Sequence, residues 1–343
     1  MESPESWFHR RATHYVEAQI LFHLNQAGVW RLLKKGGAHT APQIAGSLGL
    51  DEKATDTLLD YVFQVDNLLE RDQDNQYSLS EFGRQVVERF SDNKGNAEDS
   101  INMFDVRVGA YGPVWQNVGR MLDRSGKYGE HFIREGRYAE DGVFKLAMRF
   151  WDSLVENVEA LGVDQVLEIG LTTGLIEKLG QKYPGYKLYG LDRNERIIRQ
   201  ACESAAAKNV TNIRWIEGDY FDTDRWCKQL DGERPGLIFS LHFHELIAGG
   251  EQRFVEALRS LKAALPNWSL LAFEQPRLPH SDRTSIPETL WLYSQSNILI
   301  HHLIGNGRIL SRDTWMDLGA QAGCGQVSDR PCNYLGYRAF LFQ

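Results

Sequence analysis

Apolar positions in the first quarter of the chain recur at helical spacing. Leu, Ile and Val repeat every three or four residues over 20–33 and again over 58–63, which predicts amphipathic helices. Between them, Thr40 followed by Pro42 is typical of a helix start. Two short apolar runs flank the polar turn 72–75 and indicate a hairpin. Residues 14 to about 90 are therefore predicted to form a helix-turn-helix with a two-stranded wing, which is a winged helix.

From about residue 156 the pattern changes to short apolar runs that alternate with amphipathic segments. Strands are predicted at 165–170, 186–191, 212–216, 236–240 and 269–273, with helices between them. This alternation predicts an α/β fold with a parallel, doubly wound, Rossmann-like sheet. The last two runs, 327–329 and 336–342, have no helix between them. We expect them to form an antiparallel hairpin at the edge of the sheet.

The segment between these two patterns is predicted to link them. Residues 91–100 are polar, Tyr111-Gly112-Pro113 is a break, and 144–155 has the apolar spacing of one amphipathic helix. We therefore divide the chain into three parts. These are an all-α, winged-helix domain over 1–95, a helical linker and pocket wall over 96–155, and the α/β domain over 156–343.

Charge argues against nucleic acid as a partner. Of 343 residues, 46 are acidic and 38 basic, which gives a net charge of −8. Proteins that bind nucleic acid usually carry a basic surface. The would-be recognition helix instead carries Asp51, Asp56 and Asp60, whose charges phosphates would repel. We expect the winged helix to serve packing or dimer contacts.

No segment predicts export or a membrane span. Residues 1–11 are polar and lack the apolar core of a signal peptide. The apolar stretch 289–307 is broken by several polar side chains, so it is a poor membrane helix. The four cysteines form no CxxC pair, which suits a reducing compartment. With 42% hydrophobic residues the composition is that of a globular protein, and we expect it to be cytoplasmic.

A glycine-containing turn follows the first predicted strand, in the run EIGLTTG over 168–174. Gly170 and Gly174 would let the backbone approach a ligand, and the next helix offers free N–H groups. Thr172 stands where a nucleotide turn has its middle glycine. Asp192 ends the second strand, where a carboxylate can hold both hydroxyls of a ribose or cap the following helix.

Polar groups also follow the third and fourth strands. Asp219 could accept a hydrogen bond from an adenine amino group, and Tyr220 could pack on the ring. The fourth strand ends in Ser240, followed by His242 and His244. Open α/β sheets bind ligands at the carboxyl ends of their strands, so these residues are predicted to share one site.

Together, these runs resemble the class I S-adenosylmethionine-dependent methyltransferases. The winged helix and the antiparallel tail resemble the small-molecule O-methyltransferase branch, which dimerises through its N-terminal domain. The resemblance covers nearly the whole chain. It implies that Glu168 contacts the methionine end of the cofactor, and that Asp192 holds the ribose. The predicted cofactor site consists of Glu168, Gly170, Thr172, Gly174, Asp192, Arg193, Asp219, Tyr220, Ser240 and His242.

The same resemblance implies a catalytic base. In the branch, a His-Asp pair follows the fourth strand and its histidine removes the proton of the acceptor hydroxyl. Here the pair is His244-Glu245. Histidine titrates near neutral pH and therefore suits this role. Glu274, at the end of the fifth strand, stands where the family often carries an orienting glutamate. His242 would share a face with His244 on an extended chain, or lie beside the cofactor.

The helix predicted over 288–303 is a candidate wall of the acceptor pocket. It bears a polar stripe of Ser294, Asn297 and His301 on an otherwise apolar surface, and Trp291 could form the apolar side. A partly solvated helix face is the alternative interpretation.

The sequence thus predicts O-methylation of a small organic molecule of secondary metabolism. The family usually has a second acid near residue 309, where this chain has Ile309-Leu310. This difference leaves open C-methylation next to a carbonyl, as in a 2-oxo acid, with histidines forming the enol. Histidines could also hold a metal, but we predict none. A non-catalytic relative that only binds the cofactor is a third possibility.

Overall fold

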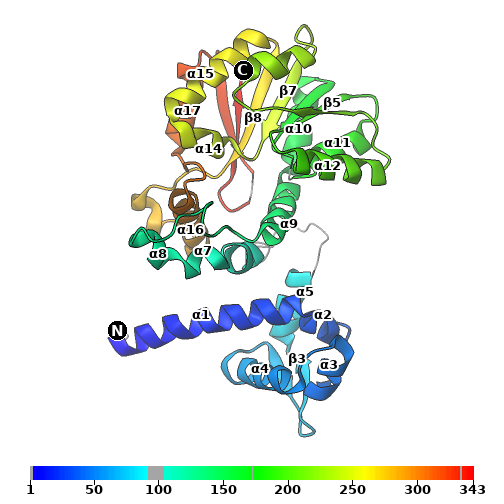
Figure 1. Cartoon of the computed structure of the whole chain (residues 1–343), viewed down its shortest axis with the longest axis vertical. Coiled ribbons are helices and arrows are strands. Elements are labelled where there is room, and N and C mark those ends of the chain that lie inside the picture. The colour runs from blue at the N-terminus through cyan, green and yellow to red at the C-terminus, as the bar shows by residue number, and fades with distance from the viewer. Residues whose placement is uncertain (1–2, 92–103, 172, 333) are drawn as a thin grey trace. The chain divides into compact units, whose positions relative to one another are not determined.

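The computed structural model describes residues 3–91, 104–171, 173–332 and 334–343 (Figure 1). The chain divides into two compact units, Met1–Gly142 and Val143–Gln343. Thr172 and nearly all of the predicted linker 91–100 lie outside the described residues. Within the described ranges, no helix combines the length and the apolar character needed to span a membrane.

The first unit begins with helices around a small sheet. Its elements are α1 (Pro4–Gln26), α2 (Val29–Lys34), β1 (His39–Thr40), α3 (Ala41–Leu48), α4 (Glu52–Val65), β2 (Leu69–Arg71), β3 (Gln76–Leu79) and α5 (Glu81–Ser91). The predicted hairpin is present as β2 and β3, which pair antiparallel with Leu69 opposite Leu79. The two-residue β1 adds a third strand on the other side of β3.

Local signals in the sequence explain how this unit folds. Thr40 caps α3 as predicted, because its side chain accepts from Gln43 N while the Gln43 side chain accepts from Thr40 N. Apolar faces of the helices meet in a core that includes Trp30, Ile44 and Leu59, all nearly inaccessible to solvent. Burial of such faces, rather than helix propensity, supplies most of the stability of short helices.

The remainder of the first unit is also helical. It contains a π-helix η1 (Asp105–Ala110), α7 (Gly112–Gln116), α8 (Val118–Leu122) and the start of α9 (Gly136–Ala147). The predicted break falls at Tyr111, between η1 and α7, and Pro113 stands in the first turn of α7. Proline is tolerated there because the first N–H groups of a helix lack partners within the helix.

The second unit is built on a seven-stranded sheet in the order β6-β5-β4-β7-β8-β10-β9. Its strands are β4 (Gln165–Ile169), β5 (Lys187–Asp192), β6 (Ile213–Glu217), β7 (Gly236–Ser240), β8 (Trp268–Glu274), β9 (Val327–Pro331) and β10 (Arg338–Phe342). The first five are parallel to one another, while β10 is antiparallel to β8 and to β9. The predicted fold class, including the antiparallel edge hairpin, is confirmed.

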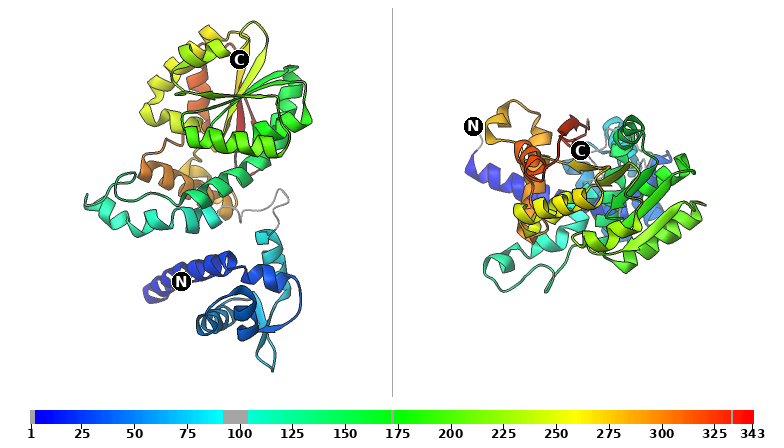
Figure 2. Two further views of the ribbon diagram at one scale, coloured as in Figure 1. Left: turned by 45° about the vertical axis from the view of Figure 1, so that its right-hand side comes forward. Right: turned by 90° about the horizontal axis from the view of Figure 1, so that it is seen from above.

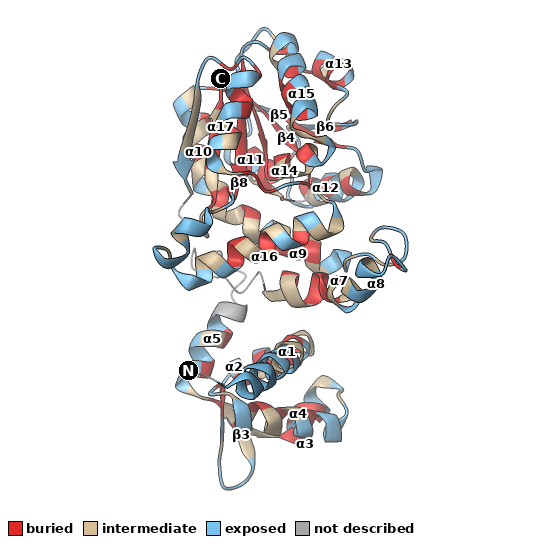
Figure 3. Cartoon of the chain, turned by 90° about the vertical axis from the view of Figure 1, so that its left-hand side faces the viewer, coloured by how far each residue is buried: buried red, intermediate tan, exposed pale blue. Residues whose placement is uncertain are grey.

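Helices cover both faces of this sheet (Figure 2). The helices of the second unit are α10 (Trp151–Leu161), α11 (Leu175–Lys182), α12 (Glu195–Ala207), α13 (Thr223–Trp226), α14 (Phe243–Leu246), α15 (Glu251–Ala264), α16 (Glu288–Ile304) and α17 (Arg312–Gln321), with 3₁₀ turns η2 (Met148–Phe150), η3 (Cys227–Gln229), η4 (Ile247–Gly249) and η5 (His280–Thr284). Of these, α16 lies beyond the ends of the strands (Figure 1). Every residue of β4 and β7 is buried, as the red central strands of Figure 3 show. Strands covered on both faces explain why the sequence has continuous apolar runs there.

The helix predicted over 144–155 is not continuous. The structure ends α9 at Ala147 and begins α10 at Trp151, with η2 between them. Phe150 is fully buried in this turn and stacks on Phe273 of β8, with centroids 5.1 Å apart and planes at 17°. A 3₁₀ turn changes the phase of the helix, and here it coincides with the residue that packs on the sheet.

Candidate active site

The turn after β4 is held from inside by Glu168. This side chain is buried, and its Oε2 accepts a hydrogen bond from Ile176 N at 3.0 Å, while Oε1 accepts from the Thr173 hydroxyl. Burial raises the pKa of the Glu168 carboxyl to about 8, although both hydrogen bonds lower it. A carboxyl with this pKa is largely protonated at neutral pH. Glu168 is thus hydrogen-bonded to Thr173 in the turn and to Ile176 at the start of α11.

Two positions in the turn require glycine. Gly170 and Gly174 have φ angles of +85° and +68°, which other residues rarely adopt. A Cβ on Gly170 would lie 2.6 Å from His242 Cδ2, and one on Gly174 would lie 2.6 Å from a ring carbon of Phe144. Both glycines of the predicted turn are therefore required for steric reasons.

Asp192 ends β5 beside this turn. Its Oδ2 accepts from Leu171 N at 3.1 Å and its Oδ1 accepts from Asn194 N at 2.9 Å. The carboxylate therefore caps its own loop, which is one of the two roles predicted for it. Each carboxylate oxygen can accept a second hydrogen bond. Burial and the nearby charges of Asp192 and Glu245 raise the pKa of the Tyr220 hydroxyl, which places Tyr220 next to this carboxylate.

The other predicted cofactor residues differ in accessibility. Asp219 is exposed, and its Oδ1 accepts from Phe221 N at 2.9 Å within its own turn. Arg193 is exposed directly after β5. Ser240 is fully buried, donates to Ile169 O at 2.7 Å and accepts from His242 N at 2.9 Å. Ser240 thus ties β7 to β4, while Asp219 and Arg193 face solvent.

His244 and Glu274 form a close pair at the ends of β7 and β8. Glu274 is 2% exposed, and its Oε1 accepts from His244 N at 2.9 Å while Oε2 lies 2.9 Å from His244 Nδ1. Both carboxylate oxygens are therefore directed at the same histidine. A carboxylate accepts hydrogen bonds, so Nδ1 carries the hydrogen and the basic lone pair is on Nε2.

His242 and Glu245 lie beside this pair. The chain is not extended here, as the shared-face argument assumed, because α14 begins at Phe243. The rings of His242 and His244 are nevertheless 6.4 Å apart. Glu245 Oε1 lies 3.7 Å from His242 Nδ1 and accepts a hydrogen bond from Asn306 Nδ2 at 2.8 Å.

The polar stripe of α16 faces the end of β8. Asn297 is buried and donates to the Gln275 side chain at 3.1 Å, and His301 contacts His244 with ring centroids 4.4 Å apart. Ser294 is fully buried, and its hydroxyl has no hydrogen-bond partner among the described residues. Trp291 is half-buried and contacts His280 instead. Two members of the stripe thus reach the neighbourhood of Glu274, and the solvated-face interpretation is wrong for Ser294 and Asn297.

The loop after α16 makes contacts with the site that the sequence did not predict. Asn306 contacts Glu245, and Arg308 N donates to His244 O at 3.0 Å. Gly307 has φ +98°, and a Cβ there would lie 2.3 Å from His244 O. The sequence run Gly-Asn-Gly over 305–307 is the signal that could have marked this tight approach.

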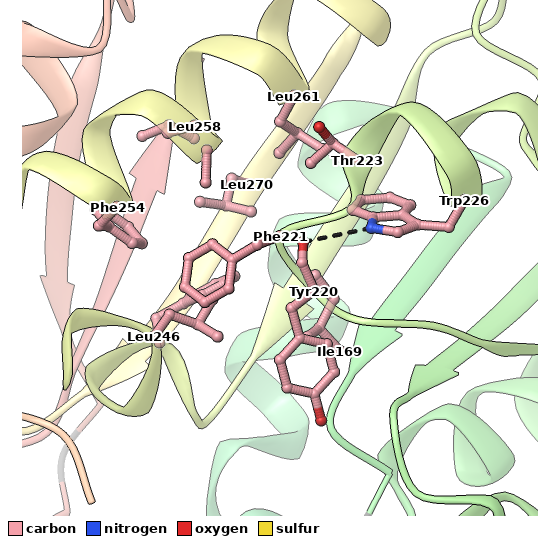
Figure 4. Close-up of a pocket in the computed structure, with 12 residues that line it drawn as sticks. Ile169, Tyr220, Phe221, Thr223, Trp226, Leu246, Phe254, Leu258, Leu261 and Leu270 are labelled. Atoms are coloured by element: carbon pink, nitrogen blue, oxygen red, sulfur yellow. Dashed lines mark hydrogen bonds between the residues drawn. The ribbon is translucent and has the colours of Figure 1, made fainter. Parts of the chain in front are cut away.

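One pocket of the second unit lies between the loop after β6 and α15 (Figure 4). It is lined mainly by apolar side chains, including Phe221, Phe254 and Leu258. The Tyr220 hydroxyl points away from Leu258 and Leu261 in this view. This pocket is not lined by His242, His244 or His301, so we do not assign the pocket to the acceptor. Among the described residues, no group of three or more His, Cys, Asp or Glu is placed to hold a metal ion.

No family model and no curated protein matches the sequence. Solved structures match over nearly the full length of both chains. They include an O-methyltransferase described as putative from Nostoc punctiforme PCC 73102 (TM-score 0.70, 17% identity, 100% of this chain and 99% of that one). Mitomycin 7-O-methyltransferase MmcR matches with a TM-score of 0.71 at 15% identity (99% and 97%). Human N-acetylserotonin methyltransferase, solved in complex with SAM, matches with a TM-score of 0.66 at 16% identity (100% and 98%). The chain therefore has the fold of these small-molecule methyltransferases.

Proposed function

We propose that this protein transfers a methyl group from S-adenosylmethionine to a small organic molecule, with His244 as general base. The observation that carries the proposal is the His244–Glu274 pair, in which a buried carboxylate makes two contacts with one histidine. The pair lies at the carboxyl ends of β7 and β8, and the glycine turn and Asp192 lie at those of β4 and β5. Open α/β sheets bind their ligands at this edge.

The residues present fit the cofactor. S-adenosylmethionine carries its methyl group on a positively charged sulfonium. Asp192 offers carboxylate oxygens at the end of β5 for the ribose hydroxyls, and Tyr220 beside it offers an aromatic face for the adenine. The solved structure of the human N-acetylserotonin enzyme with SAM supports the same cofactor. No nucleotide phosphate has to be bound, so the glycine turn need not cradle one.

His244 is proposed to take up the proton of the acceptor hydroxyl at Nε2. S-adenosylmethionine, when bound, would supply the methyl group to the acceptor oxygen and would leave as the neutral thioether S-adenosylhomocysteine. Glu274 meanwhile keeps Nδ1–H in place and stabilises the imidazolium that forms. Oxygen remains our predicted acceptor atom, and natural-product enzymes among the structural matches, such as MmcR, support an acceptor from secondary metabolism.

Calorimetric titration with S-adenosylmethionine and S-adenosylhomocysteine tests the cofactor. We expect micromolar binding that Asp192→Ala weakens at least tenfold, because the ribose loses its acceptors. Asp164→Ala is the matched control, since Asp164 is partly exposed just before β4, where its ion pair with Arg234 lies at the amino end of the strand. No binding to a folded wild-type protein, or equal binding by both variants, would contradict the proposed site.

We also propose that the N-terminal unit mediates a homodimer. Large apolar side chains are exposed along α1, namely Trp7, Phe8, Tyr15 and Val16. Exposed apolar groups of this kind mark interaction surfaces when they cluster. We expect a dimer in sedimentation velocity experiments at micromolar concentration, and a shift toward monomer when Phe8 and Tyr15 are replaced by serine. A wild-type monomer at that concentration would contradict this proposal.

A further inference from the structure

A second imidazole stands against the proposed base. His301, in the last turn of α16, lies with its ring centroid 4.4 Å from that of His244 and with the two planes at 77°. Aromatic rings favour this edge-to-face arrangement. The contact joins α16 to the short helix α14, so it depends on the tertiary fold rather than on sequence proximity.

Oxygen atoms determine where each ring carries its hydrogen. His244 Nδ1 faces Glu274 Oε2 at 2.9 Å, and His301 Nδ1 faces the carbonyl oxygen of Asn306 at 2.8 Å. A carboxylate and a peptide carbonyl both accept hydrogen bonds. Both rings therefore carry hydrogen on Nδ1, and both have Nε2 as their basic nitrogen.

The loop after α16 attaches the two histidines to each other. Asn306 N donates to His301 O at 3.1 Å, and the Asn306 side chain donates to Glu245 at 2.8 Å. Two residues later, Arg308 N donates to His244 O. One loop thus contacts the main chain of both histidines, which holds the two main-chain segments in place relative to each other.

We propose that His301 is a positioning residue for His244, and that the two imidazoles together carry at most one positive charge. This role rests on the proposed function, in which His244 is the base. Two imidazolium rings in contact would repel each other, which disfavours double protonation. The first proton goes to His244, because its Nδ1 faces the Glu274 carboxylate at 2.9 Å. His301 therefore stays neutral and holds the ring of the base without adding charge beside a cationic cofactor.

The charged and titratable groups around the pair support this assignment. His242 and Glu245 belong to the α14 segment, Glu274 ends β8, and the guanidinium of Arg308 makes an ion pair with Glu251 at 3.2 Å. The Glu274 carboxylate contacts His244 through both of its oxygens, one at the main-chain N and the other at Nδ1. Asn306 connects Glu245 to His301, because its side chain donates to Glu245 Oε1 and its carbonyl oxygen accepts from His301 Nδ1.

Histidine-selective ¹³C and ¹⁵N labelling of the full-length protein, without cofactor or acceptor, tests the inference by NMR titration. We expect His301 to titrate at least one pH unit below the usual value of about 6.5. His244→Gln should raise the pKa of His301 by at least one unit, because the like charge is removed. At pH 8 the ¹⁵N shifts should show His301 protonated at Nδ1. The exposed neighbour His302, replaced in His302→Gln, is the control and should leave His301 unchanged.

The positioning role has its own readout. The Nδ1 proton of His244, protected by Glu274, should give a downfield resonance that broadens in His301→Ala and is retained in His301→Phe, which keeps a ring. A His301 that titrates near 6.5 regardless of His244, or a His244 resonance unaffected by His301→Ala, would overturn the inference. Because no cofactor is present, these results are independent of the calorimetry, and failure of the proposed function is seen separately.

Discussion

Replacing His244 by alanine is expected to lower methyl transfer at least a hundredfold while leaving cofactor affinity nearly unchanged. General bases contribute about 10²–10⁴-fold to rate. The structure gives this histidine the two features that a base needs. Glu274 fixes its tautomer through Nδ1, and the side chain is 12% exposed, so it is largely shielded from solvent. Asp192 and the glycine turn do not depend on the imidazole for their hydrogen bonds.

The measurement is transfer of a radiolabelled methyl group to a panel of phenols, hydroxylated heterocycles and 2-oxo acids, followed by kinetics on the best acceptor. Calorimetry with S-adenosylhomocysteine reports cofactor affinity in parallel. His302→Ala is the matched control, because His302 is exposed on α16 and should retain full activity. Unchanged turnover in His244→Ala would show that another group removes the proton. Preferential methylation of 2-oxo acids would favour the carbon-methylation alternative.

Replacing Glu168 by glutamine is expected to remove a pH-dependent loss of stability. Burial raises the pKa of this carboxyl from 4.5 in a model compound to about 8 in the folded protein. Below pH 4.5 both folded and unfolded chains hold the proton, so the full stability is present. Between pH 4.5 and about 8 the unfolded chain releases it more readily, so the free energy of unfolding falls as pH rises. At about 1.4 kcal/mol per pKa unit, the total loss has an upper bound of about 5 kcal/mol.

Glutamine matches the protonated acid in shape and hydrogen bonding. Its oxygen can accept from Ile176 N and its amide can donate to the Thr173 hydroxyl. We would measure urea unfolding at pH 5 and pH 8.5. The free energy of unfolding of the variant, relative to that of the wild type, should be higher at pH 8.5 than at pH 5. Glu217→Gln, at an exposed glutamate ending β6, is the control and should show no such gain. Parallel pH dependence of Glu168→Gln and wild type would mean that Glu168 is ionised in the folded state.

The strands of the second unit could be predicted from sequence to within two residues at every end. Their apolar runs are bounded by turn residues, and burial on both faces makes the runs continuous. By contrast, β1 could not be predicted, because a two-residue strand has no periodicity of its own. It exists because His39 and Thr40 pair with Tyr77 and Gln76. The interruption at η2 could not be predicted either, because it accompanies packing of Phe150 on Phe273, a contact between residues 123 positions apart.

For the candidate site, too, residues that follow a strand could be predicted, whereas contacts that form only in the folded chain could not. His244 and Glu274 could be predicted because each follows a recognisable strand. The contact of Asn306 with Glu245 could not, because the two residues are 61 positions apart and meet only when α16 returns to the sheet. Ser240 was predicted to line the cofactor site, and its place at the end of β7 is as expected. Its buried hydroxyl, however, links two strands, which periodicity cannot reveal.

The outer strand β9 bears on how readily the protein aggregates. Among the described residues, β9 is an outer strand of the sheet. An uncovered outer strand can recruit strands from other molecules. Here β9 carries Asp329 and Arg330 and ends at Pro331, and Asp329 is paired with Arg312 and Arg338. Charge and proline discourage further strand addition. We therefore expect the β9–β10 hairpin to discourage growth into open-ended, fibril-like assemblies at this edge of the sheet.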